Sequence, residues 1–368
     1  MADDKTLYRQ QLSARCRSLH AHGIVNPAEL LARTARWCGD NDVRIDTYGA
    51  GALIEDFESR VAELLGFPAA RFMPSGTMAQ QIALRVWSER AGLRHVGMHP
   101  TCHLELHEQR GYAHLHGLHA TLVGPAARPM LAEHVSAVKE PMSVLLTELP
   151  VREAGGQCPT WDELEALKAA VAERDTRLHL DGARLWECAA WFGVKEGGRS
   201  YADVCAGFDS VYVSFYKGIG ALSGAMLLGE RWFIDEAAIW QRRCGGNLYT
   251  LAPNVASAAM LFDERLSRMT AYHERARELA RALVTLDGVR VLPDPPHTNM
   301  MHVFVPKAAE AAMDARDQVA EDTGLWLFGK VRDADMPDYC RVELSVGDAT
   351  LAVDDADIVA GFRALLES

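Results

Sequence analysis

The 368 residues are 49% hydrophobic and 24% charged, so the chain can bury a large core and is long enough for two domains. Lys plus Arg total 38 against 50 Asp plus Glu, and the charge of -12 excludes a general binder of nucleic acid or of anionic membranes. The first residues lack the apolar core of a signal peptide and no later run could span a bilayer, so we expect a protein of the cytoplasm.

The elements predicted first in the chain are helical. Residues 1–45 form an expected N-terminal helical arm, interrupted near Gly23 to Pro27. A turn at Tyr48–Gly51 then leads into a helix with one apolar face, which stops at Gly66.

Strand-like and helical segments alternate in the next part of the chain. Apolar runs occur at 71–73, 94–98, 119–124, 143–149, 177–180 and 210–215. A capping box, Thr160-x-x-Glu163, opens a helix from Trp161 to Glu173. This alternation predicts an α/β domain with a mostly parallel sheet over residues 46–255. A long helical stretch (254–286), strand-like runs (299–305, 324–328, 340–346) and a helix from 354 predict a smaller α+β domain over residues 256–368.

A possible anion site lies where the first of these strands ends. Ser75, Gly76 and Thr77 follow Met73 and open a helix, whose first backbone amides have no partner within the helix. The segment is therefore a candidate phosphate cup. An ordinary strand-to-helix turn capped by Ser75 or Thr77 is the alternative.

An acidic residue ends a later strand. Asp181 follows an apolar run in the segment His179–Arg184, and ligands of α/β sheets are met at the carboxyl ends of strands. An aspartate at that position can hold a protonated ring nitrogen through a charge-assisted hydrogen bond. The alternative is a local salt bridge between Asp181 and Arg184.

A lysine ends the last apolar run of the large domain. Lys217 follows Tyr216 at a turn rich in glycine, where partial desolvation favours the neutral, nucleophilic amine. A plain surface lysine on a turn is the alternative. Lys330 also follows an apolar stretch, but it lies in the second domain, without a phosphate cup or a strand-end acid before it. We therefore expect Lys217 to be the reactive lysine.

A phosphate cup, a strand-end acid and a strand-end lysine, in this order, match a pocket for pyridoxal 5'-phosphate. The segments resemble the L-threonine aldolase and β-eliminating lyase family of pyridoxal-phosphate enzymes, which has the aspartate aminotransferase (type I) fold. The resemblance extends over nearly the whole chain from about Asp46. It is carried by Phe72–Gln80, His179–Arg184, Ser210–Gly229, Thr298–Met300 and Cys340–Leu344.

The resemblance implies roles for individual residues. The implied cofactor-binding residues are Ser75, Gly76, Thr77, His103, Asp181, Arg184 and Lys217. Among them, Lys217 would bind the cofactor covalently, Asp181 would pair with the pyridine nitrogen and His103 would stack on the ring. Arg184 and Arg341 would bind the substrate carboxylate, for which a forked guanidinium is suited.

The general base is not identified by the sequence. His103, His107 and Glu105 are the candidates, and His103 is expected to be catalytic together with Lys217. Several further histidines crowd residues 95–119, but the spacing of a zinc protease is absent, so we expect no metal site.

Four segments depart from the family pattern. The family's N-terminal Arg-Ser-Asp-Thr has no clear match. Its Glu-Asn-Thr-His is replaced by Glu148–Gln157, in which Arg152 stays protonated and cannot act as a base. Tyr216 replaces the serine before the lysine, and Gly245–Tyr249 replaces a Gly-Gly-Gly-Met-Arg loop that reaches the neighbouring subunit's phosphate.

The family implies a lyase acting on a small amino acid, with retro-aldol cleavage of a threonine-type β-hydroxy-α-amino acid as the expected reaction. A β-eliminating lyase or a transaminase-like enzyme on the same scaffold is the alternative. A non-catalytic scaffold or regulator is a third, disfavoured by the presence of Lys217, Asp181 and Arg341. The resemblance also implies a homodimer or homotetramer.

Overall fold

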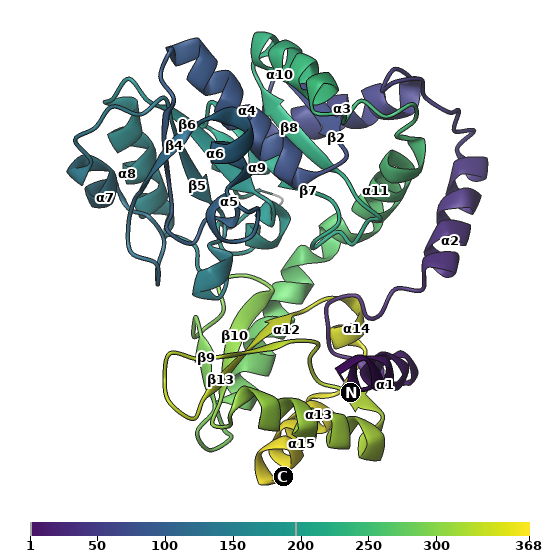
Figure 1. The fold of residues 1–368 in the computed structure, drawn as a ribbon. Helices are drawn as coiled ribbons and strands as arrows, with labels where there is room; N and C mark the ends of the chain where they lie inside the picture. The colour runs from purple at the N-terminus through teal and green to yellow at the C-terminus, as the bar shows by residue number, and fades with distance from the viewer. Residues whose placement is uncertain (1, 196) are drawn as a thin grey trace. The chain divides into compact units, whose positions relative to one another are not determined.

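The computed structural model describes residues 2–195 and 197–368, which form two compact units (Figure 1). The larger unit comprises Leu31–Glu153 and Gln157–Ser267. The smaller unit comprises Met1–Leu30, Ala154–Gly156 and Arg268–Ser368. The N-terminal helix is thus grouped with the C-terminal residues. The sequence predicts domain boundaries between residues 45 and 46 and between residues 255 and 256, and these boundaries stay a prediction.

The larger unit is built on a seven-stranded sheet with the strand order β2-β8-β7-β6-β5-β3-β4. Its strands are β2 (Ala69–Met73), β3 (His95–Met98), β4 (His119–Leu122), β5 (Val144–Glu148), β6 (Arg177–Gly182), β7 (Ser210–Ser214) and β8 (Ala225–Gly229). Strands β4, β3, β5, β6 and β7 are parallel, as predicted from the alternating pattern. β8, which the apolar pattern did not predict, runs antiparallel between β7 and β2.

The central strands are apolar because both faces of the sheet are covered. Every residue of β5 and β7 is buried, which agrees with the apolar centres of these strands, Val144–Leu146 and Val211–Val213. Helix α4 contacts β2, β3, β5, β6, β7 and β8. Helix α3 contacts β2, and α8 contacts β6. The helices assigned mainly to this unit are α2 (Pro27–Asp40), α3 (Ala52–Leu65), α4 (Gly76–Ala91), α5 (His103–Leu106), α6 (Gly111–His116), α7 (Ala132–Ala137), α8 (Trp161–Ala172), α9 (Tyr201–Cys205), α10 (Arg231–Arg243) and α11 (Ala252–Arg265), with short 3-10 turns η1 (Arg152–Ala154) and η2 (Leu185–Cys188).

Local signals fix the ends of several helices. Thr160 caps α8, and Thr160 with Glu163 forms the predicted capping box. Helix α3 ends at Gly66, whose φ of 74° is left-handed and favours glycine. The long helical stretch predicted at 254–286 is interrupted by η3 (Leu266–Arg268), which separates α11 from α12 (Met269–Leu283).

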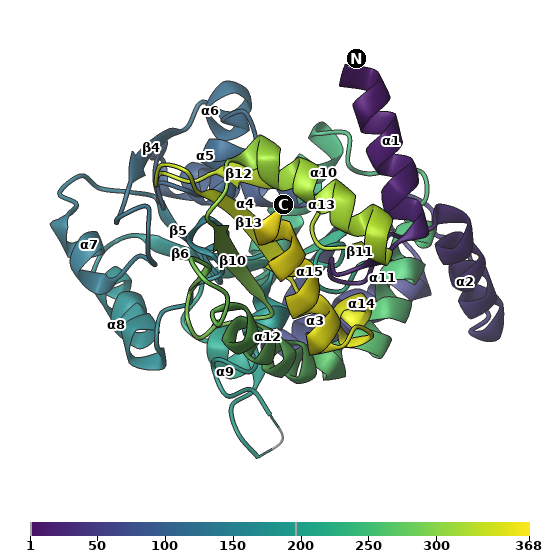
Figure 2. The same ribbon diagram turned by 90° about the horizontal axis from the view of Figure 1, so that it is seen from below.

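The smaller unit has a four-stranded antiparallel sheet with the order β12-β13-β10-β9. Its other elements are α1 (Ala2–Arg15), β1 (Arg17–Ser18), β9 (Arg290–Leu292), β10 (Met300–Val305), α13 (Ala309–Thr323), β11 (Leu325–Trp326), β12 (Val331–Asp333), β13 (Cys340–Ser345), α14 (Asp348–Leu351) and α15 (Asp355–Glu367). Figure 2 shows α1 beside α13 and α13 beside α15.

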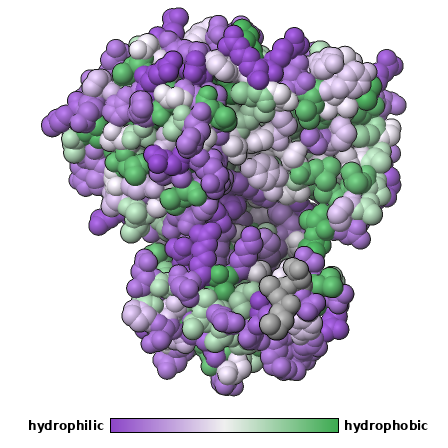
Figure 3. Space-filling model, viewed as in Figure 1, coloured by the Kyte–Doolittle hydropathy of each residue, from purple (hydrophilic) through white to green (hydrophobic). Residues whose placement is uncertain are grey.

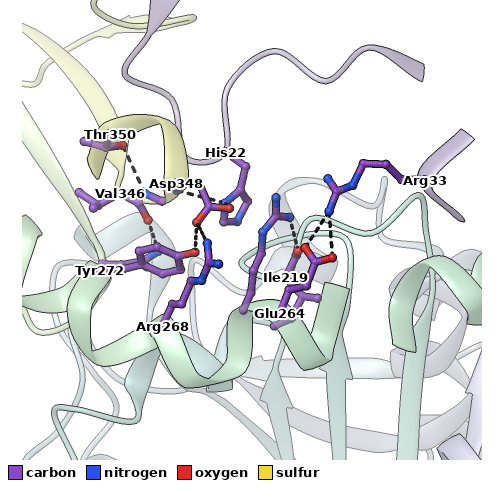
Figure 4. Close-up of polar contacts among 12 residues, drawn as sticks. His22, Arg33, Ile219, Glu264, Arg268, Tyr272, Val346, Asp348 and Thr350 are labelled. Carbon is purple, nitrogen blue, oxygen red and sulfur yellow. Dashed lines mark hydrogen bonds and ion pairs between the residues drawn. The ribbon is translucent and has the colours of Figure 1, made fainter. Parts of the chain in front are cut away.

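Polar contacts tie α12 to α14 inside the smaller unit. Asp348 accepts hydrogen bonds from the Tyr272 hydroxyl and from Arg268 Nη1 (3.0 Å), and its backbone N–H donates to His22 Nδ1 (3.3 Å) (Figure 4). These bonds connect the N-terminal segment, the start of α12 and α14 around one carboxylate.

The surface is of mixed polarity. On the face shown in Figure 3, hydrophobic residues are scattered among hydrophilic ones. Among the residues that the structure describes, no helix combines the length and apolar character needed to cross a membrane.

Candidate active site

Lys217 lies on a tightly packed turn between β7 and β8. A Cβ atom at Gly218 would overlap the Glu187 carboxylate, and one at Gly224, whose φ is +112°, would overlap the Phe72 ring. Helix α11 supports the turn, because Arg265 Nη1 donates to the Ile219 carbonyl (2.6 Å). The lysine is therefore held on a backbone with little freedom to move.

The Lys217 amine is largely buried, with both cationic and anionic side chains around it. Burial lowers its pKa, and the nearby guanidinium groups of Arg184 and Arg152 lower it further. The carboxylates of Asp181 and Glu148 raise the pKa of Lys217, but the net result is still a lowered pKa. A larger fraction of the amine is therefore neutral at pH 7 than for an ordinary lysine, which favours attack on a carbonyl.

Asp181 is buried near the end of β6, next to β7. Its Oδ1 accepts a hydrogen bond from the Ala183 amide (3.0 Å). Burial raises its pKa, while the charge on Lys217 and the Ala183 hydrogen bond lower it, with a net rise. Arg184, in the turn that follows β6, forms an ion pair with Glu187, with Nη1 and Oε1 3.7 Å apart.

His103 begins α5 and is oriented at both its backbone and its ring. Its backbone N–H donates to Glu148 Oε1 (3.1 Å), and its Nδ1 lies 2.9 Å from Glu108 Oε1. The ring is about one-third exposed, with the side chain 32% accessible. Because Glu108 accepts from Nδ1–H when the imidazole is neutral, Nε2 is then the ring atom that can accept a proton.

The two other candidate bases are engaged by neighbouring side chains. Glu105 accepts a hydrogen bond from the Tyr112 hydroxyl and pairs with Arg110 at 3.3 Å. His107 Nε2 lies 2.9 Å from Glu153 Oε1. Among residues 2–195 and 197–368, no cluster of three histidine, cysteine, aspartate or glutamate side chains has a geometry for a metal ion.

The candidate phosphate cup is the first turn of α4. Ser75 is the N-cap residue and its Oγ accepts from the Met78 amide (3.4 Å), so the capped turn considered as an alternative is present. Gly76 is buried against the Tyr212 ring, while Thr77 is half-buried. Because Tyr212 pairs with Asp181 between β7 and β6, one aromatic side chain connects the start of α4 to the strand that carries the acid.

Gly76→Ala is expected to destabilise the protein, because the added Cβ would overlap the buried Tyr212 hydroxyl. Overpacking of this kind costs about 1–3 kcal/mol, which a lower midpoint of denaturant unfolding would reveal. Gly39→Ala in α2 is the matched control, since a Cβ there meets no atom within 4 Å and alanine favours helix by about 0.5–1 kcal/mol. Equal midpoints for the two variants would contradict the expectation.

One cavity brings together residues from several strand ends. It is lined by His103, Glu148, Leu149, Pro150, Arg152, Asp181, Ala183, Arg184 and Lys217. The structure therefore places His103, Asp181, Arg184 and Lys217 around one space. Ser75, Gly76 and Thr77 are not part of this lining.

Two of the predicted residues lie in the smaller unit. Arg341 is on β13, in register with Phe304 of β10 and Arg332 of β12, and Lys330 is exposed before β12. The role of Arg341 in carboxylate binding stays a prediction.

Three glutamates at the site, Glu148, Glu108 and Glu187, have no role predicted from the sequence. Glu148 ends β5 and lines the cavity, Glu108 holds the His103 ring, and Glu187 is fully buried beside Gly218 and Arg184. For Glu148 the signal was available, since it is an acid at the carboxyl end of a strand, like Asp181. For the other two, no local pattern indicated the contact.

Known proteins share this architecture. The family model described as beta-eliminating lyase matches residues 21–308. The chain is similar to low-specificity L-threonine aldolase 1 of Arabidopsis thaliana, with 26% identity over 297 residues that cover 78% of this chain and 81% of that protein.

Two solved structures are similar over almost the whole chain. A Listeria monocytogenes protein assigned as an L-allo-threonine aldolase is 39% identical, with a TM-score of 0.91 and coverage of 98% of this chain and 99% of that one. An Exiguobacterium protein assigned as an aromatic amino acid beta-eliminating lyase/threonine aldolase is 40% identical, with the same TM-score and coverage. These similarities confirm the predicted fold class, an α/β large domain with a mostly parallel sheet and a smaller α+β part.

Proposed function

The chain belongs to the beta-eliminating lyase family, and we propose on that basis that it is a pyridoxal-phosphate-dependent lyase that cleaves a threonine-type β-hydroxy-α-amino acid to glycine and an aldehyde. One observation carries the proposal: the amine of Lys217, with its lowered pKa, shares a cavity with Asp181 and His103 at the carboxyl ends of parallel strands.

The residues that line this cavity, together with the first turn of α4 outside its lining, fit pyridoxal phosphate. Lys217 offers an amine with a lowered pKa for the cofactor aldehyde, and Asp181 offers a buried acid for the ring nitrogen. The first turn of α4 offers backbone amides for the phosphate. The absence of a Cβ at Gly76 lets that turn pack directly against Tyr212. When bound, the cofactor supplies an electron sink for the negative charge that develops at the substrate Cα.

We assign the movement of the substrate proton to His103. Glu108 at 2.9 Å fixes the Nδ1 side of the ring, so Nε2 is assigned to remove the β-hydroxyl proton. Loss of that proton breaks the Cα–Cβ bond, releases the aldehyde and leaves a carbanion at Cα that gains a proton to give glycine. Glu105 and His107 are disfavoured as bases because each is engaged by another side chain.

We assign the substrate carboxylate to Arg184, together with Arg341. The Arg184 side chain is 17% exposed and pairs with the buried Glu187, which limits the directions in which its guanidinium can point. Arg152 lines the same cavity with a permanent positive charge, and is therefore assigned to anion stabilisation and not to proton transfer.

The products formed from a panel of amino acids test the proposed reaction. With threonine, allo-threonine and phenylserine, the protein loaded with pyridoxal phosphate is expected to release glycine and the matching aldehyde. Pyruvate and ammonia from serine or cysteine, without aldehyde from the first three, would assign the alternative β-elimination. Formation of a keto acid from the amino acid that depends on an added second keto acid, which accepts the amino group, would assign transamination.

We propose a homodimer or homotetramer as the working form. An exposed aromatic pair supports this: Tyr48 and Tyr249 are 52% and 63% accessible, and their rings meet edge to face at 5.5 Å. Buried Asp46 braces this region through the backbone N–H groups of Leu251 (2.8 Å) and Ala252 (2.9 Å).

We place the activity in the cytoplasm. The structure leaves all eight cysteines as free thiols, which supports a reducing compartment.

A further inference from the structure

Glu148 and Asp181 are two buried carboxyl groups at neighbouring strand ends. The last residue of β5, Glu148, pairs in register with Asp181 on β6. Glu148 is 7% exposed and Asp181 is 5% exposed, and both line the cavity that contains Lys217. Two like charges this close in a dry site repel each other strongly, so both are not expected to be ionised.

The hydrogen bonds of the two groups differ. Glu148 Oε1 accepts from the His103 amide (3.1 Å). Its Oε2 is buried and has no hydrogen-bond partner among residues 2–195 and 197–368. An ionised oxygen left in that position would lose its hydration without gaining a hydrogen bond in return. A protonated Oε2 would instead carry a donor available to a molecule in the cavity.

The surroundings decide which carboxyl group holds the proton. Burial and the charges on Asp181 and Glu153 raise the pKa of Glu148 well above the ordinary value. The hydrogen bond from the His103 amide and the charge on Lys217 lower this pKa but do not cancel the rise. Asp181 is more favourably placed as an anion, because Lys217, the Ala183 amide and His103 all stabilise its charge. One proton shared by this pair is therefore held by Glu148.

We propose, as an addition that rests on the function proposed above, that Glu148 is a neutral carboxylic acid whose Oε2–H donates a hydrogen bond to an oxygen atom of bound pyridoxal phosphate. In this role it leaves Asp181 as the only ionised carboxyl group of the pair. It also holds the start of α5, and with it His103, through Oε1.

Two substitutions separate the neutral from the ionised form of Glu148. Glu148→Gln keeps the shape and a donor but cannot ionise, whereas Glu148→Leu keeps a similar volume without a donor. We expect Glu148→Gln to bind pyridoxal phosphate within about threefold of the wild type. We expect Glu148→Leu to bind it at least about tenfold more weakly, because leucine removes both the donor and the acceptor of the His103 amide. Equal weakening of both variants would overturn the proposal, because it would mean that the ionised form is required.

Infrared spectra of the cofactor-free full-length chain give an independent readout. Burial also raises the pKa of the Glu58 and Glu187 carboxyl groups, so the quantity to measure is the wild-type spectrum minus that of Glu148→Gln. At pH 7 this difference is expected to contain the carbonyl band of one protonated carboxylic acid. No such band, or a band that is lost only in Asp181→Asn, would overturn the assignment of the proton.

The two readouts also separate this inference from the function on which it rests. Absence of pyridoxal phosphate binding in the wild type would overturn the proposed function and the donor role of Glu148. The infrared difference would still locate the proton of the Glu148 and Asp181 pair.

Discussion

Lys217→Ala is expected to abolish aldehyde release from β-hydroxy amino acids, with kcat/KM reduced by roughly a thousandfold or more. The reason is that the variant loses the amine whose pKa is lowered by burial and by the charges of Arg184 and Arg152. Aldehyde formation, followed with a coupled dehydrogenase, measures the loss.

Lys330→Ala is the matched control, because it removes an exposed lysine that also follows an apolar stretch. It is expected to keep wild-type kcat/KM. Far-ultraviolet circular dichroism and the unfolding midpoint distinguish a chemical effect of Lys217→Ala from misfolding. If Lys217→Ala kept its activity while Lys330→Ala lost it, the assignment of the reactive lysine would be wrong.

Asp181→Asn is expected to reduce kcat/KM by about a hundred- to a thousandfold. The amide has nearly the same shape as the carboxyl group and can still accept the Ala183 hydrogen bond, so the loss comes from the missing charge. The expected consequence is a weaker electron sink, because the ring nitrogen of the cofactor no longer faces an anion.

The control for Asp181→Asn is the same substitution at Asp175, an exposed residue just before β6. Asp175→Asn is expected to leave both cofactor affinity and kcat/KM unchanged. Retention of full activity by Asp181→Asn would show that the charge on this residue has no part in the reaction.

The parallel part of the sheet was predictable because its signals are local. β5 and β7 have apolar centres that predict buried strands from local sequence alone. A residue that follows such a segment lies at the carboxyl end of a strand. For this reason, the amino-acid sequence alone indicates that Asp181 and Lys217 lie near one another at the carboxyl edge of the sheet. The capping box at Thr160 was likewise sufficient to locate the start of α8.

Features that depend on contacts between residues distant in sequence were not predictable. Nothing near Ala225 indicates that β8 turns back between β7 and β2, because the strand is short and follows a glycine-rich turn. The pairing of Glu148 with Asp181 depends on the register of β5 against β6. The contact between His103 and Glu108 depends on the irregular path of the chain after α5.

The break in the helix predicted over residues 254–286 was also not predictable from the sequence. Residues 254–286 keep a helical apolar pattern throughout, so the pattern predicts one helix. In the structure, η3 (Leu266–Arg268) divides it. Arg265 at the end of α11 bonds to Ile219, and Arg268 at the end of η3 bonds to Asp348. The partners of both arginines are distant in sequence. The local sequence around the break therefore gives no signal of it.

The attachment point of the cofactor decides most sharply whether Lys217 is the reactive lysine. Purified protein loaded with pyridoxal phosphate would be reduced with borohydride, digested and analysed by mass spectrometry. We predict a pyridoxyl adduct on the peptide that contains Lys217, together with loss of the yellow absorbance. An adduct on Lys330, or no adduct on any lysine, would contradict this assignment.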